Sequence, residues 1–217
     1  MRQEQEIKGF TLLELLVVIT IVAIVSAVGY PNFMEWRKDR EVRVSAEKIA
    51  NLITGVNTQA QRGYFPFVQF YINPQQGLVK FYAKGMSQST FSSLLNSGAK
   101  LDCKMTSSGY WDNHEINLVN SNIGVHVKGA SAACFSKDGS YYKLEGQLKS
   151  NLNLTIEGRT DAKDYVIICT NENAISSGGN CAINQANGLE KPAYLVEWTR
   201  FGNVSKFKWS GSAWNRQ

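Results

Sequence analysis

The chain has 217 residues, 43% of them hydrophobic, and a formal net charge of +5 at pH 7. This length suffices for one globular domain with an additional element and does not require a second hydrophobic core. A mildly basic surface is compatible with nucleic acid or an anionic membrane as a partner, but at this size it usually serves solubility alone. With two histidines, four cysteines and no CxxC pair, the sequence lacks the closely spaced ligands of a zinc site, so no metal is expected.

Residues 10–30 form an apolar run that contains a single charged residue, Glu14. At a rise of ~1.5 Å per residue, a helix of this length just spans a hydrocarbon core of ~30 Å. An ordinary secretory signal would have a basic first part and a small-residue cleavage site after a shorter apolar core. A plain membrane anchor would leave Glu14 unexplained, because a carboxylate near the bilayer centre costs ~2.5–3.5 kcal/mol on insertion scales. Glu14 is therefore predicted to be functional.

The segment KGFTLLELLVVITIVAIVSAVGYPNF resembles the prepilin signature of type IV pilins and type II secretion pseudopilins. That signature has Gly before the cut, Phe as the first mature residue and Glu as the fifth, which correspond here to Gly9, Phe10 and Glu14. The resemblance implies that a prepilin peptidase removes the leader, residues 1–9, and methylates the amine of Phe10. It also implies that the partners are other pilin subunits and that the chain crosses the inner membrane once before assembly. The head would then lie in the periplasm, and later in a pilus at the cell surface.

The residue types of this signature fit an assembly reaction. Cleavage frees an α-amino group that is cationic near neutral pH. In the dry core of a filament, the ammonium of Phe10 in one subunit can neutralise Glu14 of a neighbour, whereas neither charge is tolerated there alone. Glu14 is therefore expected to select the correct axial stagger between subunits.

A kinked helix is predicted to continue beyond the apolar run. Pro31 lacks an amide donor and Gly29 lowers the local helix propensity, which predicts a hinge near residues 29–33, where the resembled family also has its helix kink. Beyond the hinge, apolar residues recur at spacings of three and four, as on one face of an amphipathic helix that ends near Gly63. These apolar residues are Val42, Ala46, Ile49, Ala50, Ile53, Val56 and Ala60.

Short β-like runs separated by Gly, Asn and Ser follow Gly63. They predict an α+β pilin fold, in which a long kinked N-terminal helix packs on an antiparallel β-sheet head. The expected regions are a leader at 1–9, a transmembrane or filament-core helix at 10–33, an amphipathic spine helix at 34–63 and a globular β-rich head at 64–217. Candidate strands lie at 65–72, 78–82, 116–119, 124–127, 132–135, 141–144, 152–156, 165–169, 194–199 and 203–209, with a short helix at 90–95.

The even number of cysteines in a chain predicted to cross a membrane indicates disulfides formed in an oxidising compartment. Four cysteines allow three connectivities. A bridge between Cys169 and Cys181 would close a loop rich in Gly, Ser and Asn, and Cys103 would then pair with Cys134 by elimination. The alternative is a set of free, buried thiols.

Two further segments resemble one group within this superfamily. The run ACFSKDGS at 133–140 resembles a strand-and-turn motif of the pseudopilin H and FimT/FimU minor pilin group, and VEWTRFGNVSKFKW resembles the closing hairpin of that group. The resemblance implies a head with two sheets and favours a minor pilin over a major one. A pseudopilin of a type II secretion system remains the alternative.

The sequence shows no catalytic constellation, since GxSxG, HExxH, P-loop and GxGxxG motifs are absent. His114 lies beside Asp112 and Glu115, a pattern more typical of a solvated polar loop than of a metal site. We therefore expect a protein that is not an enzyme and that needs no cofactor.

The C-terminal stretch combines cations with aromatic residues. Cations that contact phosphates and aromatics that stack on bases are the ingredients of DNA binding without sequence preference. Some pilins of the resembled group are DNA receptors in natural transformation, so a DNA-binding minor pilin is a second alternative. The competing interpretation is an edge hairpin with aromatics in the core and lysines that discourage aggregation. The candidate DNA-binding residues are Arg200, Lys206, Lys208 and Arg216.

Overall fold

The computed structural model describes residues 10–75, 78–103, 111–120, 123–126, 131–143, 164–170, 181, 183–184, 188–189 and 192–217. The chain divides into two compact units, one that ends at Lys38 and one from Asp39 to Gln217. The long helix α1 (Leu12–Gln61) contributes residues to both units. The second unit, called the head below, contains all the other helices and strands.

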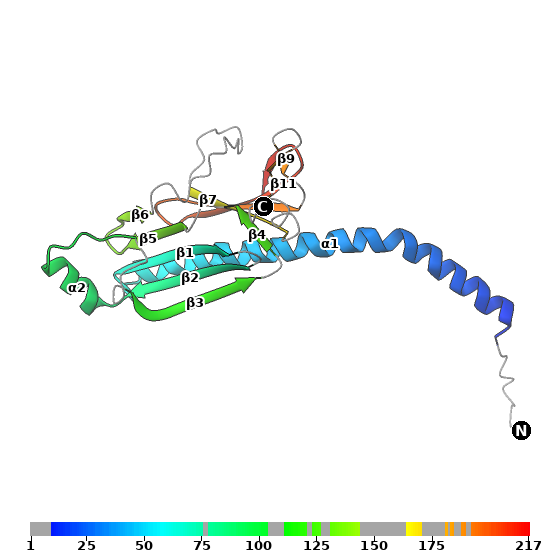
Figure 1. The fold of residues 1–217 in the computed structure, drawn as a ribbon, viewed down its shortest axis with the longest axis horizontal. Helices are drawn as coiled ribbons and strands as arrows, with labels where there is room; N and C mark the ends of the chain where they lie inside the picture. The colour runs from blue at the N-terminus through cyan, green and yellow to red at the C-terminus, as the bar shows by residue number, and fades with distance from the viewer. Residues whose placement is uncertain are drawn as a thin grey trace, which may run out of the picture. The chain divides into compact units, whose positions relative to one another are not determined.

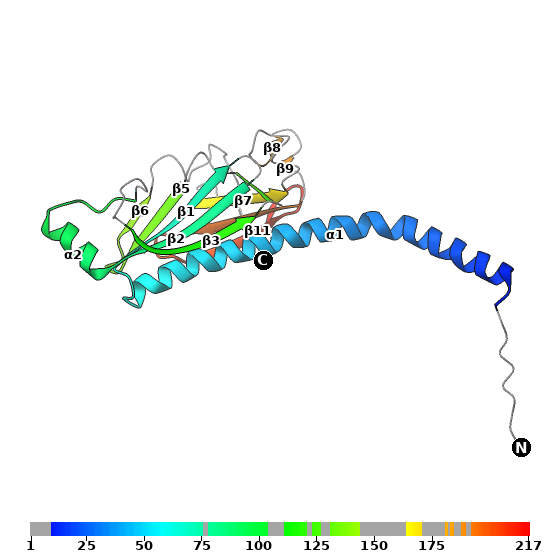
Figure 2. The ribbon, with the colours of Figure 1, turned by 60° about the horizontal axis from the view of Figure 1, so that its bottom comes forward.

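Within the residues described, the head contains two five-stranded sheets in which all pairs of neighbouring strands are antiparallel. The first sheet has the order β3-β2-β1-β5-β6, and the second has the order β12-β11-β10-β7-β4. Figures 1 and 2 show the second half of α1 lying along the strands. This arrangement confirms the predicted α+β fold, with a long N-terminal helix packed on antiparallel sheet.

The first sheet consists of β1 (Phe67–Gln75), β2 (Leu78–Met86), β3 (Asp112–Asn120), β5 (Ser131–Ser136) and β6 (Tyr141–Lys143). The second consists of β4 (Ile123–His126), β7 (Asp164–Thr170), β10 (Ala193–Trp198), β11 (Val204–Trp209) and β12 (Trp214–Arg216). A short helix, α2 (Gln88–Asn96), follows β2, and β8 (Ile183–Asn184) pairs with β9 (Gly188–Leu189). The strand expected at 152–156 lies outside the described residues.

Helix α1 ends at a glycine in the left-handed region. Gly63 has φ +75°, its N–H donates to the Ala60 carbonyl (3.0 Å), and the Tyr64 N–H donates to the Gln59 carbonyl (3.2 Å). This pair of bonds is a Schellman motif, which satisfies carbonyls that the last turn would otherwise leave unpaired. The predicted stop of the helix at Gly63 is therefore confirmed.

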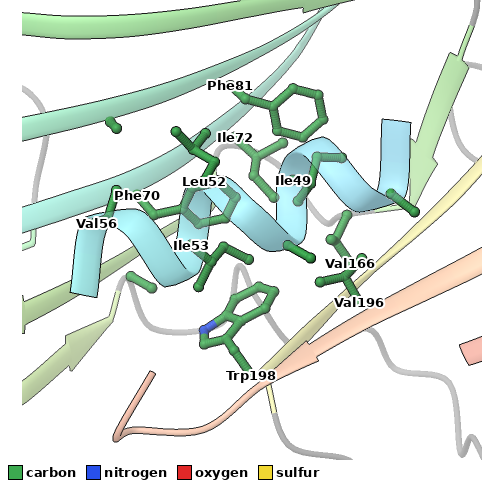
Figure 3. Packing of buried hydrophobic residues seen from close by; sticks show 14 of the residues in the cluster. Ile49, Leu52, Ile53, Val56, Phe70, Ile72, Phe81, Val166, Val196 and Trp198 are labelled. Carbon is green, nitrogen blue, oxygen red and sulfur yellow. The ribbon is translucent and has the colours of Figure 1, made fainter. Parts of the chain in front are cut away.

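The main hydrophobic core lies where α1 meets both sheets (Figure 3). Ile49 and Ile53 of α1 pack in one cluster with Phe70 of the first sheet and with Val196 and Trp198 of the second. All seven apolar residues predicted to line this face of the helix are buried. This face of the helix therefore belongs to the core of the head, whereas residues on the opposite face are exposed.

The outer faces of the two sheets are also covered. A disulfide between Cys103 and Cys134 lies in an apolar cluster with Phe67, Met86 and Phe91 on the outside of the first sheet. A disulfide between Cys169 and Cys181 lies in a cluster with Leu195, Phe207 and Trp214 on the outside of the second. Since β7 and β10 are covered on both faces, every residue in these two strands is buried, and their sequences are almost continuously apolar.

A partly buried polar network links the two sheets. The Trp198 Nε1–H donates to the hydroxyl of Tyr141 (3.1 Å), and Tyr141 donates to Oδ2 of Asp164 (2.7 Å). The Lys143 ammonium donates to Oδ1 of the same carboxylate (3.3 Å). Tyr141 and Lys143 lie on β6, whereas Asp164 and Trp198 lie on β7 and β10, so the network ties the edge of the first sheet to the middle of the second. Burial raises the pKa of the Tyr141 hydroxyl far above its usual value, and the Asp164 carboxylate raises it further.

The turn between β10 and β11 docks on α1. Gly202 has φ +75° and its N–H donates to the Thr199 carbonyl (2.9 Å). The Asn57 side-chain amide of α1 donates to the Phe201 carbonyl (2.9 Å). A Cβ added at Gly202 would overlap the Asn57 side chain, whereas one at Gly63 would meet nothing within 4 Å.

We expect Gly202→Ala to destabilise the head more than Gly63→Ala does. Both substitutions place an alanine at positive φ, which costs about 1–2 kcal/mol. At Gly202 the clash with Asn57 adds about 1–3 kcal/mol, the usual cost of overpacking. Urea unfolding of the full chain in detergent micelles, followed by tryptophan fluorescence, measures both variants. Equal losses of stability in the two variants would show that the Asn57 side chain moves away from the added methyl group without a cost in free energy.

Tyr141→Phe should lower the free energy of unfolding by about 1–3 kcal/mol, because it leaves a buried indole N–H without its acceptor and removes one of the two donors to the Asp164 carboxylate. The effect should depend on pH. Tyr141 stays neutral in the folded chain but ionises near pH ~10 when unfolded, so its contribution is present below that pH and is lost as the pH rises further. The loss of stability between about pH 8 and about pH 11 should therefore be smaller in the variant. Tyr64→Phe, at a side chain that is 73% exposed, is the control and should change neither quantity.

Candidate functional site

The first turn of α1 begins directly after the expected cleavage position. Phe10 and Thr11 precede the helix, and Phe10 is 84% exposed. The Glu14 N–H donates to the Thr11 hydroxyl (3.1 Å), and the Leu15 N–H donates to the Thr11 carbonyl (3.2 Å), so Thr11 is the N-cap. Thr11 was not singled out from the sequence, although Thr-x-x-Glu is the capping-box pattern that could have identified it. Gly9 lies outside the described residues.

Glu14 lies in the first turn of this helix and is the one charged residue among residues 10–30 of the sequence. The N-terminal end of a helix carries partial positive charge, which typically stabilises a carboxylate there by about 0.3–1 kcal/mol. Around it, the large apolar side chains from Leu12 to Val25 have exposed fractions between 46% and 82%. A contiguous apolar surface of this kind marks a site of contact with a membrane or with other protein.

The helix bends between its apolar part and the part that follows. Within the described part of the chain, no single straight helix is long and apolar enough to cross a membrane. The segments Leu12–Ala27 and Gly29–Gln61 meet the requirement of length and composition together, with a bend of 40° between them. Pro31 lies inside the helix, which continues through it without a break.

The bend falls between Ala27 and Gly29, directly beside the hinge predicted near residues 29–33, and the chain stays helical through it. Its position follows from the geometry of proline, whose ring clashes with the carbonyl four residues earlier, here that of Ala27. Pro31 and Gly29 thus remain the residues to which we attribute the bend, but the bend itself begins about one turn before the proline.

The four candidate DNA-binding residues do not form a free cationic surface with stacking aromatics. Lys208 donates to both carboxylate oxygens of Asp39 on α1 (2.9 and 3.0 Å), and Lys206 lies 4.0 Å from Glu47 of the same helix. Arg216 donates to the Ser205 hydroxyl (3.5 Å). Arg200 lies over the ring of Phe201, its neighbour in the turn (4.6 Å).

Asp39 is shared by two residues of the second sheet. The Tyr194 hydroxyl donates to both of its oxygens at 3.2 Å. The hydrogen bond from Lys208 to Asp39 raises the pKa of this lysine. Burial raises the pKa of Tyr194, and the charge of Asp39 adds to the increase. Asp39 is 155 positions from Tyr194 and 169 positions from Lys208 in the sequence. The sequence pattern contained no signal for contacts over such separations.

Most aromatics of the same stretch belong to the core. Trp198 is fully buried, Phe207 is 1% exposed and Trp214 is 4% exposed, whereas Phe201 at the turn is 57% exposed. Since Lys206 and Lys208 alternate with Phe207 along β11, the lysines face α1 and the phenylalanine packs in the outer cluster of the second sheet. DNA binding by this stretch is not supported. The side chains of His114 and His126 are not described, and no group of potential metal ligands occurs among the residues that are.

The family model described as the prokaryotic N-terminal methylation motif matches residues 7–30, which include Gly9, Phe10 and Glu14. No curated protein and no solved structure matches the chain. The motif supports a pilin-like protein of the type IV pilin and pseudopilin superfamily. It implies cleavage by a prepilin peptidase, anchoring of the N-terminal segment in a membrane and assembly with other pilins.

Two phenylalanines of the C-terminal stretch should respond differently to truncation. Phe207→Ala empties a buried site and should lower the free energy of unfolding by about 3–5 kcal/mol. Phe201→Ala, at the exposed turn, should change it by less than about 0.5 kcal/mol. Urea unfolding of the two variants compares the effects directly. A small effect at Phe207 would contradict its place in the core.

Proposed function

We propose that the chain is a minor pilin of a type IV pilus, a structural subunit without enzymatic activity. A prepilin peptidase removes the leader after Gly9 and methylates the amine of Phe10. The mature chain is held in the membrane by the first part of α1 and then joins a filament through that same part. The match of the methylation motif to residues 7–30 is the observation that carries the assignment to a pilin-like subunit. The resemblance of residues 133–140 and of the C-terminal hairpin to the minor pilin group favours a minor subunit.

The exposed segment of α1 supports a role in assembly. Its apolar side chains offer a surface that membrane lipid covers before assembly and other subunits cover afterwards. The transfer is favourable only if Glu14 finds a positive partner, because a buried carboxylate without one is strongly destabilising. The α-amino group of Phe10 in a neighbouring subunit is that partner, since cleavage creates it four residues before Glu14 in every copy.

A pseudopilin of a type II secretion system is the alternative assignment, because both machines use the same N-terminal signal. Mass spectrometry of sheared filaments tests the proposal. For a minor pilin we expect a mature N-terminus at methylated Phe10 and an amount far below that of the main subunit. An unprocessed N-terminus, or an amount equal to that of the main subunit, would contradict it.

Glu14→Ala should leave a folded, processed and membrane-inserted protein that enters filaments at least about tenfold less often, because the neighbouring ammonium loses its partner and an unpaired buried charge costs about 3–5 kcal/mol. Immunoblots of sheared filaments and of membranes measure the two pools. Glu35→Ala is the matched control, since Glu35 is an exposed acid of the same helix beyond the apolar run, and this variant should assemble normally. Normal incorporation of Glu14→Ala would exclude the proposed pairing.

A further inference from the structure

Three aromatic side chains follow the apolar run of α1 and are exposed to solvent. Tyr30 is 67% exposed, Phe33 is 55% exposed and Trp36 is 54% exposed. Phe33 and Trp36 are one turn apart, and their ring centroids are separated by 5.9 Å. None of the three belongs to a hydrophobic cluster of the described residues, so packing within the core does not account for aromatic residues at these positions.

Two cations follow the aromatics directly. Arg37 and Lys38 come one and two residues after Trp36. Positions 30, 33 and 37 are spaced by three and four residues, so Tyr30, Phe33 and Arg37 lie along one face of the helix. Tyr and Trp, whose rings carry a polar group on an apolar body, are together with cations typical of protein surfaces at the boundary between membrane and water. Phe33 adds apolar area beside Trp36.

The position of these residues along the helix fits that boundary. Tyr30 is eighteen residues beyond Leu12, the first residue of α1, which corresponds to about 27 Å at a rise of ~1.5 Å per residue. A hydrocarbon core is ~30 Å thick. If the apolar segment occupies the core, the side chains from Tyr30 onward lie at the level of the lipid head groups.

We propose that Tyr30, Phe33, Trp36, Arg37 and Lys38 form an interfacial belt that binds the head groups of anionic phospholipids while the chain is anchored in the membrane. The aromatic rings fix the depth of the helix, and the two cations attract lipid phosphates. The proposal rests on membrane anchoring, which the methylation motif implies, and not on assembly into a filament.

The depth of Trp36 is tested with the full chain in phosphatidylcholine vesicles. Subtracting the emission of Trp36→Phe from that of the unchanged chain isolates the signal of Trp36. Lipids brominated near the glycerol end of their chains should quench this signal more than lipids brominated near the methyl end. Equal quenching by both lipids, stronger quenching by the deeper bromine, or no quenching by either would overturn the belt.

The preference for anionic lipid is tested by exchanging which lipid carries the bromine. Brominated phosphatidylglycerol in phosphatidylcholine, compared with the reverse mixture, gives the relative association constant of the two lipids at the belt. Each cation near the surface contributes a factor of up to about 5, so we expect a preference for phosphatidylglycerol of several-fold and at most about 30-fold. Salt at about 1 M should abolish it by screening.

Arg37→Gln/Lys38→Gln should bring this ratio close to one while leaving the depth of Trp36 nearly unchanged. The matched control is Lys100→Gln/Lys137→Gln, which removes the same charge from exposed positions of the head and should keep the preference. A ratio near one in the unchanged chain, or an unaltered ratio in the belt variant, would overturn the proposal. Neither result bears on filament assembly, which the Glu14 variant tests separately.

Discussion

The burial of one face of α1 against both sheets is the contact on which the head depends. The same cluster holds Ile49 and Ile53 from the helix, Phe70 from the first sheet and Val196 and Trp198 from the second. Each such side chain contributes about 1.5–3 kcal/mol when fully buried. Without the helix, the inner faces of the two sheets would lose the residues that fill the space between them. The polar network around Asp164 is a second link between the two sheets. Its hydrogen bonds can form only while the core holds the sheets in this relative position.

The same helix carries two apolar patterns with different consequences. In the head its apolar residues follow one face, and the opposite face is polar, as expected for a helix packed on one side. From Leu12 to Val25 almost all side chains are apolar and exposed, a pattern that is stable only when lipid or protein surrounds the helix. Folding of the head and assembly through the N-terminal segment therefore depend on different residues. This separation is what allows Glu14 to be changed without disturbing the core.

Local patterns could be predicted from the sequence, and contacts between distant residues could not. The spacing of apolar residues identified the buried face of α1, and Gly63 identified its end. The β-rich runs identified most of the strands. Each of these features depends on residues that are neighbours in the chain. The strand β12 was missed because three residues carry too little pattern. The contacts of Asp39 with Tyr194 and Lys208 were missed because they depend on the register between helix and sheet. The N-terminal signature could be recognised from the sequence because its residues are neighbours in the chain.

The contacts between β11 and α1 change the interpretation of the chain's net positive charge. Composition alone made nucleic acid a candidate partner, and the cations near the C-terminus were the natural place to seek it. Lys206 and Lys208 instead face Glu47 and Asp39, so their charges serve the attachment of β11 to α1. Ion pairs at such half-exposed sites contribute at most about 1 kcal/mol each. They therefore matter more for the register of β11 on the helix than for total stability. Arg37 directly follows the exposed aromatics, where lipid phosphate is the partner proposed for its charge.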